Sequence, residues 1–249
     1  MKSNIKDKNS IIYGFHSVQE AINTGTPFDK ILFRKGIKSE TFSEIFQEIR
    51  EKGIPYQFVP QQKLDSITRK THQGVIAFIA PVEIQKIEDI LPGLFEQGKN
   101  PFLMILDKVT DVRNFGAITR TAECAGVDAI IVPAKNSAGI NEDAVKTSAG
   151  ALLKVPICRT IDLTQTVQYI KDSGIQLVAT SEDSKYDYYN VDYIKPTALI
   201  MGAEDKGVSR ELLQLANFTV KIPMAGEIAS LNVSVAAGII MYEVVKQRR

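Results

Sequence analysis

The sequence FLMIL at residues 102–106 is a continuous apolar run, and the polar residues 107–111 follow it directly. An apolar run without alternation predicts a strand that is buried on both faces, as in a parallel sheet covered by helices. The same signature recurs at residues 129–132, 175–179, 198–201 and 218–222, with helical stretches between the runs. This alternation predicts a doubly wound α/β fold, in which a ligand site lies beyond the carboxyl ends of the strands.

A smaller α/β unit precedes this sheet. The patterns at residues 30–33, 55–59 and 74–79 are typical of strands, and the spacing at 42–52 predicts an amphipathic helix. Residues 83–100 form a polar connection with one short amphipathic helix. We therefore expect a first domain at residues 1–82, a linker at 83–100 and a larger domain at 101–249.

Charge is nearly balanced over the 249 residues. The chain has 30 Lys or Arg and 29 Asp or Glu, so a formal charge of +1 does not by itself indicate a nucleic-acid partner. By part, residues 1–82 carry 12 Lys or Arg and 8 Asp or Glu, whereas residues 83–249 carry 18 and 21. The N-terminal part is therefore the better candidate for contact with a polyanion, although so small a surplus is also common on a solvated surface.

Cysteine and histidine are scarce. The only cysteines are Cys124 and Cys158, and the only histidines are His16 and His72. We expect no disulfide framework and no metal site, because neither pair has the spacing of a known ligand motif. No apolar run approaches the roughly 18 residues of a membrane span, and the first residues are polar, so we expect a soluble cytoplasmic protein.

The first polar segment, residues 107–122, leads from a strand end into a helix. Asn114 is expected near the start of that helix and Arg120 further along it. Each has an ordinary structural alternative: Asn114 as a helix cap, and Arg120 as an ion-pair partner of Asp107 or Glu123.

The second segment, GAEDKGVS at residues 202–209, has two glycines at the spacing of half a phosphate-binding P-loop. Val208 stands where a P-loop has its lysine, and Glu204 and Asp205 would repel a triphosphate. The segment therefore favours a neutral or positively charged ligand. The alternative is a tight turn that uses Gly202 or Gly207 for its backbone freedom.

The third segment, residues 222–238, is expected to begin as a loop and continue as a helix. Its first helical turn is expected to hold Ser230, Asn232 and Ser234, which are more hydrogen-bonding side chains than one cap needs. The small residues at 236–238 would let another backbone approach closely, which indicates a packing or dimer surface.

Together the three segments resemble the motifs of the SpoU (TrmH-like) branch of the SPOUT superfamily. The matching patterns are N-x-G-x-x-x-R-T-A at 114–122, M-G-x-E-x-x-G at 201–207 and I-P-M-x-G-x-x-x-S-L-N-V-S-x-A at 222–236. Near the N-terminus, YGFHSVQEA at 13–21 and HQGV at 72–75 resemble the small ribosomal-protein-like substrate-binding domain of RlmB-type ribosomal RNA guanosine methyltransferases.

The resemblance implies a C-terminal α/β knot, with residues 222–234 tucked through a loop, and a homodimer whose active site includes an arginine of the other subunit. It implies that S-adenosylmethionine is held near the following residues: Thr180, Gly202, Glu204, Gly207, Ile222, Met224 and Leu231. In the same way it implies that Arg120 contacts the RNA and stabilises a developing alkoxide. Asn114, Ser230 and Asn232 would orient the ribose and Arg120, while Glu204 would fix its loop.

The implied function is 2'-O-methylation of an RNA ribose, with a guanosine of large-subunit ribosomal RNA as the target. The alternatives are a transfer RNA methyltransferase and a non-catalytic RNA-binding protein of the same fold. The chain reads Gly-Ala-Leu-Leu-Lys at 150–154, where RlmB-type enzymes tend to have an acidic residue, so the target nucleotide stays open. His72 and Gln73 are candidates for RNA contact, with a strand-entry turn as their alternative.

Overall fold

The computed structural model describes residues 11–203, 205–227 and 230–249. The chain forms two compact units. The first ends at Val82 and also includes Gly139–Glu142, and the second consists of Glu83–Ala138 and Asp143–Arg249.

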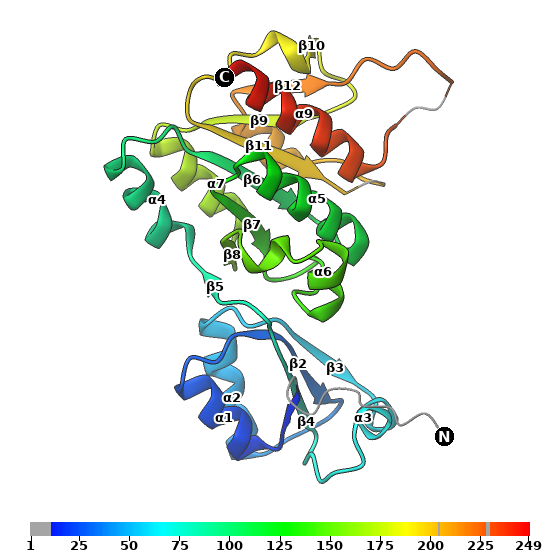
Figure 1. Cartoon of the computed structure of the whole chain (residues 1–249). Coiled ribbons are helices and arrows are strands. Elements are labelled where there is room, and N and C mark those ends of the chain that lie inside the picture. The colour runs from blue at the N-terminus through cyan, green and yellow to red at the C-terminus, as the bar shows by residue number, and fades with distance from the viewer. Residues whose placement is uncertain (1–10, 204, 228–229) are drawn as a thin grey trace. The chain divides into compact units, whose positions relative to one another are not determined.

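A four-stranded sheet forms the centre of the first unit. Its strand order is β1 (Ile11–Tyr13), β4 (Val75–Ile79), β2 (Phe28–Arg34) and β3 (Tyr56–Val59). Strand β4 runs antiparallel to both neighbours, and β2 is parallel to β3. Helices α1 (Phe15–Asn23) and α2 (Glu40–Glu51) pack on one face, and α3 (Gln61–Ile67) packs on the other (Figure 1).

An eight-stranded sheet forms the second unit. Its strand order is β10 (Tyr186–Asp187), β12 (Phe218–Lys221), β9 (Gln176–Thr180), β11 (Thr197–Gly202), β6 (Phe102–Asp107), β7 (Ala129–Pro133), β8 (Ile157–Thr160) and β5 (Ile84–Gln85). All neighbouring strands are parallel. The predicted α/β class and its mainly parallel sheet are thus confirmed, and every residue of β6 is buried, as its apolar run predicts.

Helices cover both faces of this sheet. They are α4 (Ile87–Glu96), α5 (Val112–Ala125), α6 (Glu142–Thr147), α7 (Leu163–Asp172), α8 (Arg210–Leu215) and α9 (Val233–Gln247), with short 3-10 turns at Ala151–Leu153 and Tyr188–Asn190. Helices α4, α7 and α8 bury apolar side chains against one face. Helices α5 and α9 lie side by side on the opposite face (Figure 1).

The segment 83–100, expected as a linker, is part of the second unit. Its first residues form β5, which adds a strand beside β8, and its helix α4 buries Ile87, Leu91 and Leu94 in the core. The polar composition of the segment reflects the solvent-facing side of an amphipathic helix rather than a free connection.

Helix α9 begins later than the sequence pattern predicts. Asn232 is its N-cap and Val233 its first residue, so Ser230 precedes the helix and only Ser234 lies in the first turn. The reason is local: the Asn232 side chain accepts a hydrogen bond from the Ser234 backbone N–H, which fixes the start of the helix at that point.

Candidate active site

The carboxyl ends of four adjacent strands lie along one edge of the large sheet. Gly202 at the end of β11 is in register with Asp107 at the end of β6, and β9 ends next to β11 at Thr180. The Thr180 hydroxyl donates to the Ile200 carbonyl over 3.3 Å. Strand β12 ends at Lys221, one residue before Ile222. Three candidate cofactor positions, Thr180, Gly202 and Ile222, therefore lie at the edge where parallel sheets bind ligands.

Gly202 is in tight contact with the loop that follows it. A Cβ atom added at Gly202 would overlap the backbone of Gly207, because the loop turns back against the strand end. The Gly207 N–H donates to the Ala203 carbonyl over 2.8 Å, and Gly207 has a φ of +62°. Gly207 thus has the positive φ that the turn alternative predicts. Gly202 is required for another reason, because a side chain there would overlap the Gly207 backbone. Glu204, the remaining candidate in this loop, lies outside the described residues.

A side-chain hydrogen bond joins the first and third segments directly. Asn232 Nδ2 donates to Asn114 Oδ1 over 3.0 Å, although the residues are 118 positions apart. Asn232 Oδ1 also accepts from the Ser234 N–H at 3.0 Å and from the Ser234 hydroxyl at 2.6 Å. These three bonds fix the Asn232 amide in one orientation.

Asn114 is not the cap of its helix. The N-cap of α5 is Asp111, whose carboxylate accepts from the N–H groups of Arg113 and Asn114 over 2.8 Å each. The capping alternative for the Asn114 side chain is therefore wrong, and its carbonyl oxygen is used for the bond to Asn232.

Arg120 lies on α5 with an exposed side chain. The two carboxylates predicted as its alternative partners are engaged elsewhere: Asp107 accepts the Ser209 N–H over 2.7 Å, and Glu123 pairs with Lys154 over 3.2 Å. Within the described residues Arg120 forms no ion pair, so no described carboxylate neutralises its guanidinium. The structural alternative for Arg120 is wrong.

The loop between β12 and α9 contains the remaining candidates. Met224 is 41% exposed, Ser230 is exposed and Leu231 is half-buried. Among the described residues of this loop, 222–227 and 230–231, no backbone group hydrogen-bonds to another backbone group outside helices and strands. Backbone groups of this loop that have no backbone partner among the described residues therefore lie beside the strand ends, where a ligand could use them.

Asp107 is a feature that the sequence reasoning considered only as a partner of Arg120. Its carboxylate is buried, and its bond to Ser209, the N-cap of α8, ties the end of β6 to the far end of the 203–208 loop. A charged residue at the end of a fully apolar strand is the signal that points to this role.

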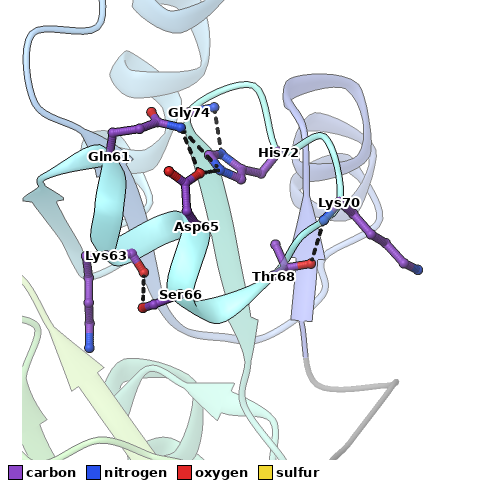
Figure 2. A network of polar contacts seen from close by, with 8 residues as sticks. All are labelled: Gln61, Lys63, Asp65, Ser66, Thr68, Lys70, His72 and Gly74. Carbon is purple, nitrogen blue, oxygen red and sulfur yellow. Dashed lines mark hydrogen bonds and ion pairs between the residues drawn. The ribbon is translucent and has the colours of Figure 1, made fainter.

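His72 and Gln73 lie in the first unit, and Figure 2 shows the His72 ring between Asp65 and Gly74. The His72 side chain is only 6% exposed, and its Nδ1 accepts the Gly74 N–H over 3.1 Å. Its Nε2 therefore carries the proton and donates to Asp65 over 3.0 Å, which holds the pKa of the Asp65 carboxyl below its usual value. Gln73 has a φ of +54°, and its side-chain carbonyl accepts the Phe15 N–H over 3.1 Å. These contacts favour the strand-entry turn over direct RNA contact by either residue.

Two family models match the chain over most of its length. Residues 101–242 match the SpoU rRNA methylase family, and residues 11–85 match the domain described as RNA 2'-O ribose methyltransferase substrate binding. The chain belongs to the SpoU family. It is thus an RNA methyltransferase with a separate N-terminal substrate-binding domain, as the resemblance implies.

Relatives of this SpoU family member are similar to it over nearly the whole chain. A protein of Staphylococcus aureus strain MSSA476, named as a TrmH family tRNA/rRNA methyltransferase, is 38% identical over 241 residues, which is 97% of each chain. The SpoU methyltransferase AviRb from Streptomyces viridochromogenes, solved in complex with AdoMet, is 25% identical with a TM-score of 0.61 and coverage of 98% and 95%. An AdoMet-bound rRNA methyltransferase from Sinorhizobium meliloti is 26% identical with a TM-score of 0.61 and coverage of 95% and 87%.

Two further properties of the SpoU family member concern metals and membranes. In the part of the chain that the structure describes, no three His, Cys, Asp or Glu side chains are grouped as metal ligands. No described helix is both long and apolar enough to cross a membrane.

Proposed function

We propose that this protein transfers a methyl group from S-adenosylmethionine to the 2'-hydroxyl of a ribose in RNA. The observation that carries the proposal is the hydrogen bond between Asn232 and Asn114, because it joins the first and third motifs at the sheet edge where Gly202 begins the second. The site residues of all three motifs are assigned on that basis.

The chemistry of the site fits the methyl donor. S-adenosylmethionine combines an adenine base, which hydrogen-bonds well to backbone groups, with a sulfonium cation. The backbone groups of residues 222–224 and 231 that have no backbone partner among the described residues suit the base. At Gly207 nothing lies within 4 Å of an added Cβ, so a ligand can approach the main chain there. A triphosphate is disfavoured, because Val208 stands in place of the P-loop lysine and Asp205 is exposed nearby. The Asp205 carboxylate favours a cationic group instead.

When bound, the donor supplies an electrophilic methyl group. The protein then has to orient the ribose hydroxyl and stabilise the charge that develops on its oxygen. We assign ribose orientation to Asn232, Asn114 and Ser230. We assign phosphate contact and stabilisation of the developing alkoxide to Arg120, whose planar guanidinium presents several N–H donors to an anionic oxygen.

The proton of the ribose hydroxyl has no histidine to receive it. Both histidines of the chain, His16 and His72, belong to the first unit, and His72 is committed to Asp65 and Gly74. We therefore propose that a substrate phosphate or water takes the proton.

An exposed Arg120 without an ion pair among the described residues also supports an active site shared between two subunits. We propose a homodimer in which Arg120 of one subunit serves the donor pocket of the other. The knot through residues 222–234 and the cytoplasmic location stay predictions, which a knot-sensitive unfolding experiment and cell fractionation would check.

We propose a guanosine of large-subunit ribosomal RNA as the target. The match of residues 11–85 to the substrate-binding domain of RNA 2'-O ribose methyltransferases supports an RNA substrate bound partly by this domain. The names of curated relatives include both tRNA and rRNA, so a transfer RNA substrate is the second candidate.

Calorimetry with S-adenosylmethionine tests the function, and Arg120→Ala tests the assignment. The variant is expected to bind the donor as the wild type does and to lose methyl transfer by about 10²- to 10³-fold, because the lost interaction acts on the RNA. Arg113→Ala, a change of another exposed arginine on the same helix, is the matched control and should retain activity. Absence of donor binding at millimolar concentration would contradict the enzyme, and equal loss of binding and transfer would contradict the role of Arg120.

A further inference from the structure

Charge is segregated within the first unit. Five of the eight acidic residues in 1–82 lie on helices α1 and α2, which cover one face of the four-stranded sheet: Glu20, Glu40, Glu44, Glu48 and Glu51. Residues 30–38 and 66–82, in contrast, contain six Lys or Arg and no Asp or Glu. The total charge of the chain is nearly neutral, but within this unit acidic and basic side chains are concentrated in different segments.

Five of these cations have exposed side chains and lie at the end of β2 or in the two loops that follow β2 and α3. We call them the basic cluster: Arg34, Lys35, Lys38, Arg69 and Lys70. None of the five pairs with a carboxylate within the described residues. Asp65, the nearest acid in sequence to the second loop, is already held by His72. The positive charge of the basic cluster is thus uncompensated.

The two loops are neighbours in space. The Arg34 N–H donates to the Gly74 carbonyl over 2.9 Å, so the end of β2 is paired with the end of the 68–74 loop. A Cβ at Gly74 would come within 2.8 Å of Ile37 Cδ1 and 3.4 Å of Arg34 Cβ. The loops therefore pack closely enough for their cations to act on one polyanion.

His72 fixes the loop that carries Arg69 and Lys70. Its buried ring bridges Asp65 on α3 and the Gly74 N–H, and the Lys70 N–H donates to the Thr68 hydroxyl over 3.2 Å. Figure 2 shows the Lys70 side chain extending away from this network, with Lys63 pointing in a different direction. A loop fixed in this way loses little conformational entropy when its cations bind a ligand.

Aromatic rings lie beside two lysines of the first unit, of which Lys70 belongs to the basic cluster. The Lys70 ammonium lies 5.4 Å from the centre of the Tyr13 ring, and the Lys30 ammonium lies 5.5 Å from that of Phe78. Both rings are only half-buried and pack on the same face of the sheet as α3. Half-buried rings beside cations suit the unpaired bases of RNA, which stack on aromatic side chains.

We propose that the basic cluster is the surface of the N-terminal domain that binds the phosphates of the RNA substrate. The inference rests on the proposed function for the identity of the polyanion. RNA fits better than an acidic protein, because protein interfaces are centred on apolar side chains. Among the described residues of this unit, Phe58 is the only large apolar side chain that is exposed, and at 37% it is only marginally so.

Two double variants of the full-length protein test the proposal: Arg69→Ala with Lys70→Ala, and Arg34→Ala with Lys35→Ala. The probe is a transcribed large-subunit ribosomal RNA, and its affinity is measured between about 50 and about 200 mM salt. The plot of log K against log salt has a negative slope, and each lost phosphate contact should make it shallower by about 0.7 to 0.9, hence by about 1.4 to 1.8 for a double variant. We expect affinity to fall about tenfold or more at the lower salt.

The matched control is Arg50→Ala with Lys63→Ala. It removes the same charge from α2 and α3, at exposed positions outside the basic cluster. Wild-type affinity and slope in both cluster variants would overturn the proposal, as would an equal loss in the control.

S-adenosylmethionine calorimetry on the same samples separates this proposal from the proposed function. If the cluster variants lose RNA affinity while the wild type binds no donor, the basic cluster stands and the methyltransferase assignment falls. If the wild type binds the donor and methylates RNA while the cluster variants bind RNA normally, only the basic cluster is refuted.

Discussion

At the residue scale, the Asn114–Asn232 hydrogen bond is the contact on which the site assignment depends most. Asn114→Ala removes the acceptor of the Asn232 amide, so that group loses one of the three bonds that orient it. We expect methyl transfer to fall about tenfold or more with donor affinity unchanged, because misorientation affects the reacting geometry. Steady-state kinetics beside donor calorimetry measures both. An unchanged kcat would contradict the assignment of Asn114 to the active site.

The two cysteines provide a second prediction at this scale. Burial raises the pKa of the Cys158 thiol to about 12, whereas Cys124 is exposed. An alkylating reagent near pH 8 should therefore modify only Cys124 in the folded protein and both residues after unfolding. Mass spectrometry of the native and denatured protein measures this, with Cys124→Ala as the control that should stay unmodified when folded.

The same thiol has a consequence for stability at high pH. The ordinary thiol pKa is 9.0, so between that value and about 12 the unfolded chain releases a proton that the folded chain retains. The free energy of unfolding should thus fall across this window and be unaffected by Cys158 below it. Denaturant titrations of the wild type and Cys158→Ala would show the difference.

At the element scale, the close approach of the 203–207 loop to the end of β11 is the critical feature. Gly202→Ala places a methyl group against the Gly207 backbone, which cannot move aside as a flexible side chain could. We expect a loss of about 2 kcal/mol or more in unfolding free energy and at least tenfold weaker donor binding. Chemical denaturation and calorimetry test this.

Gly93→Ala is the matched control for that substitution. Gly93 lies inside helix α4, and nothing lies within 4 Å of an added Cβ. It should raise the unfolding free energy by about 0.5 to 1 kcal/mol, as alanine does inside a helix. Similar effects of both substitutions would show that the turn at Gly202 is not tightly packed.

Strands were predictable where burial alone determines them. Residues 102–106 and 198–201 are apolar without interruption, and both form central strands. In contrast, β5 and β10 have two residues each, Ile84-Gln85 and Tyr186-Asp187, and exist through pairing with β8 and β12. A strand of two residues is too short to show a hydrophobic period in the sequence, so neither strand could be predicted.

The candidate site was likewise predictable only where local sequence determines it. The buried runs predicted the edge of the sheet at which Thr180, Gly202 and Ile222 lie, whereas the roles of the site residues stay predictions. The bond between Asn114 and Asn232 and that between Asp107 and Ser209 each join residues more than 100 positions apart, and only the folded sheet brings them together. For His72 and Gln73 the sequence left two alternatives open. Burial and the use of both ring nitrogens favour the structural one for His72. For exposed Gln73 it is favoured by the bond from the Phe15 N–H to its side-chain carbonyl.

At the scale of the whole molecule, Arg248 ties the C-terminus to the start of β6. Its guanidinium donates to the carbonyls of Asn100, Pro101, Tyr193 and Lys195, and it lies 5.3 Å from the centre of the Phe102 ring. Arg248→Ala leaves these carbonyls without their donor, so we expect a loss of about 2 to 4 kcal/mol in unfolding free energy. Arg249→Ala, a change of the neighbouring exposed arginine, should alter it by less than about 0.5 kcal/mol. Equal effects of the two substitutions in denaturant titrations would contradict the proposed role of Arg248 in stability.

The most direct test of the proposed activity is nucleoside mass spectrometry of ribosomal RNA from a strain that lacks the protein, before and after incubation with the purified protein and S-adenosylmethionine. The account predicts one new 2'-O-methylated nucleoside, a guanosine, which appears with the wild type and is absent with Arg120→Ala. A methyl group on a base, or no methyl group on any ribosomal or transfer RNA despite donor binding, would contradict it.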